Sequence, residues 1–148
     1  MKRLFMIIAA LVFIGTGAFA QTSLSETIAS GKKVFVQIVN DADHPIPEDE
    51  QADVVRCVAE AGQWTVAESA DAADFIVSVQ CRKKVVFNSP RTWLTPSVLD
   101  KEGNVLWQGK QFKADATTFN GFKATNRCIN KMIEYGFQKD LFVKAGRN

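Results

Sequence analysis

Hydrophobic and polar residues alternate in two short stretches, which is the spacing of strands with one buried face. From Lys33 to Val39 the buried side would carry Val34, Val36 and Ile38. From Asp74 to Gln80 it would carry Phe75, Val77, Val79 and Cys81, leaving Ile76, Ser78, Gln80 and Arg82 opposite. Between these stretches, residues 48–61 follow a proline, begin with three acids and repeat apolar side chains at helical spacing. The first half therefore predicts strand, helix, strand.

The second half predicts two further strands and a long helix. The second strand is expected to extend to Phe87 and to turn through Asn88–Pro90 into a third strand, Thr92–Leu99. Asp100–Gly103 is typical of a type I turn closed by a glycine at positive φ, which predicts a hairpin with a fourth strand from Asn104 to about Phe112. A final helix is expected from near residue 120 to about 142. Its buried stripe would consist of Thr125, Cys128, Ile129, Met132, Ile133 and Gly136.

The predicted order is β-α-β-β-β-α, which indicates an α+β fold. The helix between the first two strands implies a parallel crossover, and the later strands would form an antiparallel meander. Both helices would cover one face of a mixed four-stranded sheet, giving a two-layer sandwich. Pro96 conflicts locally with this pattern, because proline cannot donate to a ladder. The third strand is therefore expected to lie at an edge or to carry a bulge.

The first twenty residues have the pattern of a cleaved secretory signal peptide. Lys2 and Arg3 precede an apolar run from Leu4 to Ile14, and Ala18–Ala20 presents a small-x-small cleavage site. A membrane anchor is the alternative, but the run is about half the roughly 20 apolar residues that a spanning helix needs. We expect cleavage after Ala20, a lead-in at 21–31, one domain at 32–142 and a tail at 143–148. The product would be periplasmic or extracellular, without a stable membrane anchor.

Removing that leader changes the charge balance of the chain. The full sequence has 18 basic and 16 acidic residues, and the leader contains two of the bases. The mature chain is then neutral overall, so its composition does not indicate nucleic-acid binding. Residues 21–80 contain eleven acids against three bases, whereas residues 81–148 contain thirteen bases against five acids. The two halves either neutralise each other in the fold or present a polarised surface that orients a partner.

The three cysteines are candidates for one disulfide in an oxidising compartment. If the two helices start at the same end of the sheet, Cys57 and Cys128 both lie roughly 12–14 Å along their helices. A Cys57–Cys128 bridge is therefore predicted ahead of either pairing that uses Cys81. The open alternative is three buried, reduced thiols.

Acidic residues cluster in the loop and helix start at 40–50, but no catalytic or metal-binding motif accompanies them. His44 is the only histidine, and no nucleophile motif appears elsewhere. The acids have no EF-hand spacing, and acids at a helix start already favour the helix dipole. We therefore assign no catalytic residue, metal or cofactor, and keep a small carboxylate hydrolase near this loop as the alternative function. The residues concerned are Asp41, Asp43, Glu48, Asp49 and Glu50.

The order of the predicted elements and three sequence segments together resemble a known group of domains. The segments are Ala-Asp-Phe-Ile-Val at 73–77, the stretch Asp100–Gly109, and Lys-Asp-Leu-Phe at 139–142. Residues 32–142 resemble small bacterial envelope domains of the TolB N-terminal and curli-secretion-lipoprotein type. The resemblance implies a non-enzymatic domain that acts through protein contacts and contributes no catalytic residues. The residue directly after Ala20 is Gln21 and not a cysteine, so the chain departs from the lipoprotein members.

The sequence therefore favours an exported binding or assembly module, whose partner would be an envelope protein or a glycan. The polar face of the sheet, which would include Thr95 and Ser97, and the basic strand end beside it form the candidate contact surface. Its assigned residues are Gln37, Ser78, Gln80, Arg82, Lys83 and Lys84.

Overall fold

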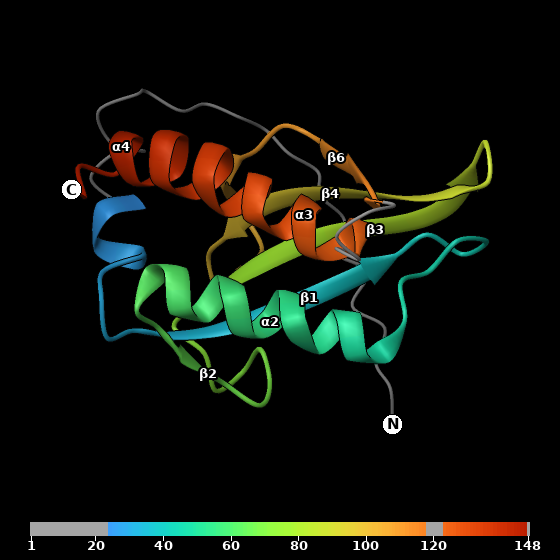
Figure 1. The fold of residues 1–148 in the computed structure, drawn as a ribbon. Coiled ribbons are helices and arrows are strands. Elements are labelled where there is room, and N and C mark those ends of the chain that lie inside the picture. Colours follow the sequence, from blue (N-terminus) through green and yellow to red (C-terminus); the bar gives the residue numbers. More distant parts are fainter. Residues whose placement is uncertain (1–23, 118–122, 148) are drawn as a thin grey trace.

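A computed structural model describes residues 24–117 and 123–147 as one mixed sheet covered on one face by helices (Figure 1). Residues 24–27 form a short helical turn. The elements that follow are β1 (Lys33–Asn40), α2 (Glu48–Gly62), β2 (Thr65–Val66), β3 (Phe75–Val86), β4 (Ser89–Leu99), β5 (Val105–Gln108), β6 (Phe112–Asp115), α3 (Ala124–Lys131), the π-helix η1 (Met132–Leu141) and α4 (Phe142–Lys144).

The α+β class and the mixed sheet are confirmed, but the predicted count of four strands is wrong. The six-stranded sheet has the order β2-β1-β3-β4-β5, and β6 also pairs with β4. β1 is parallel to both β2 and β3, whereas β4 is antiparallel to β3, β5 and β6. The additional strand β2 has only two residues, too few to produce an alternating pattern. The other additional strand arises because the predicted fourth strand is broken into β5 and β6.

Pro96 accounts for the position of that break. β4 is an interior strand, with β3 on one side and β5 and β6 on the other. The residues between β5 and β6 pass Pro96, whose carbonyl accepts the N–H of Gly109 at 2.9 Å. A register shift follows between Val98 and Leu99. The irregularity predicted at the proline therefore appears mainly in the neighbouring strand, because Pro96 offers no N–H to it.

The helices lie on the same face of the sheet and run in the same direction (Figure 1). α3, η1 and α4 follow one another without interruption from Ala124 to Lys144, so the long final helix is confirmed although its middle is a π-helix. Its predicted start near residue 120 lies outside the described residues. Phe75, Phe137, Leu94, Met132 and Leu141 are among the largest fully buried side chains. The core therefore lies between the sheet and the helices.

The two hairpin turns differ in how well they were predicted. The turn at Asp100–Gly103 is confirmed: Gly103 has φ of 88° and its N–H donates to the carbonyl of Asp100 at 3.1 Å. The β3–β4 turn is shorter than predicted, because Val86 pairs directly with Ser89. Its two loop residues are Phe87 and Asn88, with φ of 51° and 65°.

The segments on either side of the predicted domain pack against it. Leu24 and Ile28 are buried, and the indole of Trp64 donates to the carbonyl of Ile28 at 2.9 Å. Near the other end, Ala145 is buried and Arg147 donates to the carbonyls of Ile28 and Gly62. The predicted leader at 1–20 lies outside the described residues. None of the described helices is both long and apolar enough to cross a membrane.

Candidate functional site

The face of the sheet opposite the helices carries a shallow polar hollow of about 240 Å³. We call it the open-face hollow. It spans three strands, because it is formed from the end of β1, the middle of β3 and the middle of β4, and it includes one residue from the break between β5 and β6. Its lining residues are Val39, Asn40, Asp41, Gln80, Cys81, Arg82, Trp93, Thr95 and Gln111. A hollow of this size admits one side chain or one small ring.

Arg82 and Trp93 form the centre of this hollow. They are directly paired across β3 and β4, and the guanidinium carbon of Arg82 lies 4.1 Å from the centroid of the Trp93 ring. The Nε atom of Arg82 is buried and has no hydrogen-bond partner among the described residues. An unpaired buried donor costs free energy. A hydrogen bond from an acceptor to this donor would therefore contribute more binding free energy than a hydrogen bond to an exposed arginine. The guanidinium of Arg82 therefore carries a donor that no described residue uses, next to an aromatic ring.

A second arginine approaches the same ring. The guanidinium carbon of Arg91 lies 5.9 Å from the Trp93 centroid, and its Nε donates to Asp115 at 2.6 Å. This hydrogen bond lowers the pKa of Asp115 and raises the pKa of Arg91. Because Asp115 already occupies Arg91, Arg82 is the arginine with capacity for a further acceptor.

The structure brings together most of the predicted contact residues. Ser78, Gln80 and Arg82 alternate along β3, and Gln37 pairs with Ser78 from β1. Lys84 continues the same side of β3 and is exposed. Trp93 was missed as a site residue, although it follows the same two-residue alternation as Thr95 and Ser97. Gln111 had no such signal, because its position depends on the break beside Pro96.

Lys83 does not share that surface, because its side chain points to the helix layer. Its Nζ lies 2.8 and 2.9 Å from the two carboxylate oxygens of Glu50 on α2. The hydroxyl of Thr125 also donates to Glu50, and it lies 2.8 Å from the hydroxyl of Thr92. Glu50, Thr92 and Thr125 are all buried, so this cluster joins α2, β3, β4 and α3 inside the fold.

The acids of the 40–50 loop do not converge on one point. Asp41 accepts the backbone N–H groups of Asp43 and His44, and therefore holds the loop in a turn. Asp49 is exposed and lies 3.8 Å from Lys123. Among the described residues, no group of three or more His, Cys, Asp or Glu side chains is placed to hold a metal ion.

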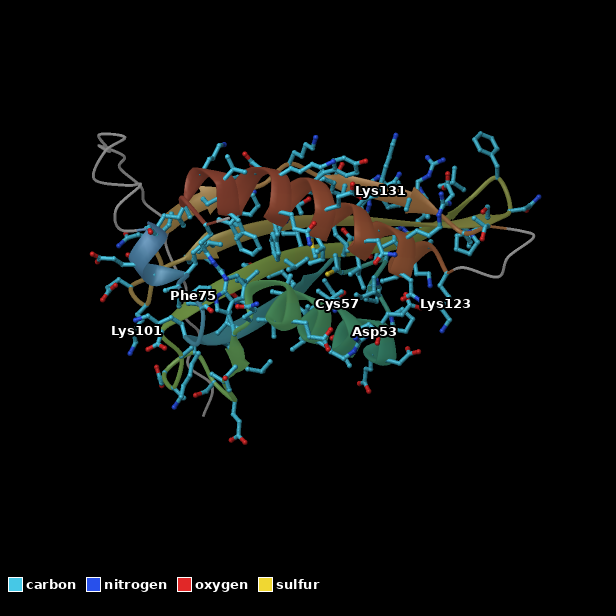
Figure 2. The ribbon with its side chains drawn as sticks, turned by 60° about the vertical axis from the view of Figure 1, so that its left-hand side comes forward. Asp53, Cys57, Phe75, Lys101, Lys123 and Lys131 are labelled. Atoms are coloured by element: carbon cyan, nitrogen blue, oxygen red, sulfur yellow. The ribbon has the colours of Figure 1, made fainter. Side chains whose placement is uncertain are left out.

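All three cysteines are free thiols in the structure, so the predicted Cys57–Cys128 bridge is not formed there. Cys57 lies on the side of α2 that faces α3 and lines a hollow with Ile129 (Figure 2). Cys81 and Cys128 are buried, and their thiols donate to the carbonyls of Val79 and Phe112. Burial raises the pKa of Cys81 and of Cys128 to about 12. It also raises the pKa of Cys57.

Comparison with known proteins identifies the fold. No family model and no curated protein matches this chain. Among solved structures, a variant of the PelC dodecamer from Paraburkholderia phytofirmans is similar at a TM-score of 0.54 and 18% identity, covering 70% of this chain and 87% of PelC. Protein XCC0632 from Xanthomonas campestris has a TM-score of 0.53 and 11% identity, covering 80% and 87% of the two chains.

A third similar structure is the hypothetical protein CT253 from Chlamydia trachomatis. Its TM-score is 0.52 at 8% identity, and the match covers 80% of this chain and 100% of CT253. At these identities the likeness concerns the arrangement of strands and helices alone. The chain therefore shares the fold of PelC, XCC0632 and CT253.

Proposed function

We propose that this chain is an exported, non-enzymatic binding module of the bacterial envelope, acting through the open-face hollow. The leader pattern at 1–20 supports export. The resemblance of residues 32–142 to envelope domains, and the fold shared with PelC, support a role in contacts rather than chemistry. PelC forms a dodecamer, so a protein with this fold can form stable protein–protein contacts.

The observation that carries the proposal is the buried, unpartnered Nε of Arg82. A guanidinium binds carboxylates and carbonyls through a planar set of donors. The face of Trp93 that Arg82 covers is not available for stacking by a sugar ring, since the guanidinium lies 4.1 Å from the ring centroid. These contacts favour a protein segment that presents a carboxylate or carbonyl over a glycan that stacks on the tryptophan.

Site-specific photo-crosslinking in the native host tests this function. A crosslinking residue at Thr95, in the hollow, is expected to capture one defined partner, whereas the same residue at Lys131 on the helix layer is not. Arg82→Gln should abolish the Thr95 adduct, and Arg82→Lys should restore only part of it. Lys101→Gln, in the exposed β4–β5 turn, is the matched control and should leave the adduct unchanged.

Two results would overturn the proposal. One is the absence of a Thr95 adduct in cells that contain the folded protein in the envelope fraction. The other is an Arg82→Gln variant that captures the same partner as efficiently as the unaltered chain. A captured glycan instead of a protein would retain the binding role and reject the acceptor-bearing protein segment.

A further inference from the structure

The β3–β4 hairpin extends beyond the rest of the sheet and ends in exposed apolar side chains. β1 pairs with β3 only as far as Cys81, and β6 pairs with β4 only from Arg91. The remaining ribbon projects at one end of the molecule (Figure 1). We call Lys84, Val85, Phe87 and Asn88 the hairpin tip. Phe87 is 95% exposed and Val85 64% exposed, so two apolar side chains are in water at the tip.

Phe87 is also an unfavourable residue for its backbone conformation. Both loop residues of this two-residue hairpin have positive φ, which is the geometry of a type I′ turn. Asparagine and glycine are preferred there, whereas a bulky side chain at positive φ is an outlier. Neither folding nor solubility accounts for an exposed phenylalanine at this position. Local conflicts of this kind are typical of functional sites.

An apolar groove lies on the other side of the fold, between α2 and β2. Its floor is formed by Ala52, Val55, Ala59, Trp64 and Val66, and its rim by Arg56, Glu60 and Gln63. The groove has a volume of about 600 Å³. Val66 belongs to the two-residue edge strand β2 and is 46% exposed. The groove is therefore apolar, open and large enough for an aromatic side chain.

The hairpin tip and the groove are complementary but cannot meet within one molecule. Figure 1 shows β2 and the C-terminal half of α2 at the opposite end from the hairpin. Lys84 is exposed at the tip and has no ion pair with the described residues, whereas the neighbouring Arg91 is paired with Asp115. Beside the groove, Asp53 and Glu60 both pair with Arg56, at 3.3 and 3.5 Å. The tip is therefore basic and the groove rim acidic, in agreement with the opposite charges of the two halves of the chain.

We propose that the chain associates with itself head to tail, with the Phe87 ring of one copy seated in the α2–β2 groove of the next. The contact joins two different surfaces, so each copy retains one free tip and one free groove, and the assembly extends or closes into a ring. Burying Phe87 and Val85 supplies the apolar contact, and Lys84 approaches the acidic rim. This inference is independent of the open-face hollow and goes beyond the binding function proposed above.

Sedimentation equilibrium of the chain without residues 1–20 tests the contact with two variants that leave the fold intact. Phe87→Asn places a favoured residue in the I′ turn and removes the ring. Ala52→Lys exchanges one good helix former for another and places a cation in the groove. The unaltered chain is expected to show a mass that rises above the monomer with concentration, and each variant is expected to remain monomeric. Val143→Asn, which removes another exposed apolar side chain, is the control and should still associate.

Mixing the two variants gives the decisive result. The Ala52→Lys chain retains its tip and the Phe87→Asn chain retains its groove, so an equimolar mixture should form a heterodimer and nothing larger. A monomeric unaltered chain at millimolar concentration would overturn the proposal. Association that survives either substitution would do the same. If the chain is monomeric but floats with anionic phospholipid vesicles in a Phe87-dependent manner, the tip is a membrane contact instead. The Arg82→Gln variant should self-associate normally. A loss of self-association can therefore be distinguished from a loss of partner binding at the open-face hollow.

Discussion

The Nζ atom of Lys83 lies 2.8 Å from Oε2 of Glu50. The side chain of Glu50 is 5% exposed and the side chain of Lys83 is 21% exposed, so the ion pair is largely buried. This ion pair joins the start of α2 to the part of β3 that leads into the hairpin. The hydroxyl of Thr125 on α3 supplies a further hydrogen bond to the carboxylate. Glu50 therefore holds both helices and the sheet together at one end of the core.

Replacing Lys83 by methionine should destabilise the fold by about 3 kcal/mol, because it leaves the Glu50 carboxylate buried without a cation. The double variant Lys83→Met/Glu50→Gln should recover most of that loss, since it removes both charges and keeps a polar partner for Thr125. Urea unfolding followed by circular dichroism measures both effects. A single variant within about 0.5 kcal/mol of the unaltered chain would show that solvent already compensates the pair.

The elements predicted correctly are those with a long local pattern. β1 has two buried positions and β3 has four, in each strand at a two-residue spacing. The 48–61 helix has both a proline start and an apolar stripe. β2 consists of Thr65 and Val66 alone, so it depends on pairing with Lys33 and Val34 and not on its own sequence. The break between β5 and β6 likewise depends on a proline in the neighbouring strand.

The candidate site divides in the same way. Alternation along β3 places Arg82 on the open face, as predicted. The prediction that Lys83 belongs to the same contact surface is wrong, because its side chain points to Glu50 in the helix layer. Alternation cannot identify Glu50 as the partner of Lys83, because the two residues are 33 positions apart in sequence. The unpartnered Nε of Arg82 and the groove beside β2 also follow from packing between distant segments. Function is therefore harder to predict from this sequence than fold class.

The three thiols should differ in reactivity in the folded protein. Cys81 and Cys128 are buried with pKa values raised to about 12, whereas Cys57 is only partly buried. The thiolate is the reactive form, so iodoacetamide at pH 8 should modify Cys57 first and the other two only after unfolding. Mass spectrometry of the intact chain would show one adduct under native conditions and three in urea. Rapid native labelling of Cys128 would contradict the described packing.

Alkaline pH should destabilise the fold through the same two buried thiols. Their pKa is higher in the folded chain than the ordinary value of 9.0, so folding favours the protonated form. The stabilisation is present in full below pH 9 and is lost as pH rises toward the folded value of about 12. Cys128→Ala should therefore show a shallower fall in unfolding free energy than the unaltered chain over this interval. Equal slopes would exclude Cys128 as a contributor.

The Arg91–Asp115 pair should set the titration of one carboxylate beside the hollow. The hydrogen bond from Arg91 holds the pKa of Asp115 below its ordinary value of 3.8. Any stabilisation from this pair is present above that value and is lost as pH falls through the folded pKa. Arg91→Gln should return the Asp115 pKa toward the ordinary value, measured by NMR of the side-chain carboxyl. Lys144→Gln, which removes the ion pair with Asp140, is the control and should leave the Asp115 pKa unchanged.

Gly62 should not tolerate even a methyl group, because of Trp64. A Cβ atom added at Gly62 would lie 2.3 Å from the indole ring. That ring is fixed by its hydrogen bond to Ile28 at 2.9 Å and by edge contact with Phe75 at a centroid distance of 4.9 Å. Gly62→Ala should therefore displace the indole and destabilise the chain by about 1–3 kcal/mol, with a change in tryptophan fluorescence.

Gly31→Ala is the comparison, because Gly31 has φ of 84° but no atom within 4 Å of the added carbon. It should cost about 1 kcal/mol through backbone strain and leave the fluorescence unchanged. Equal fluorescence shifts in the two variants would contradict a steric effect on Trp64.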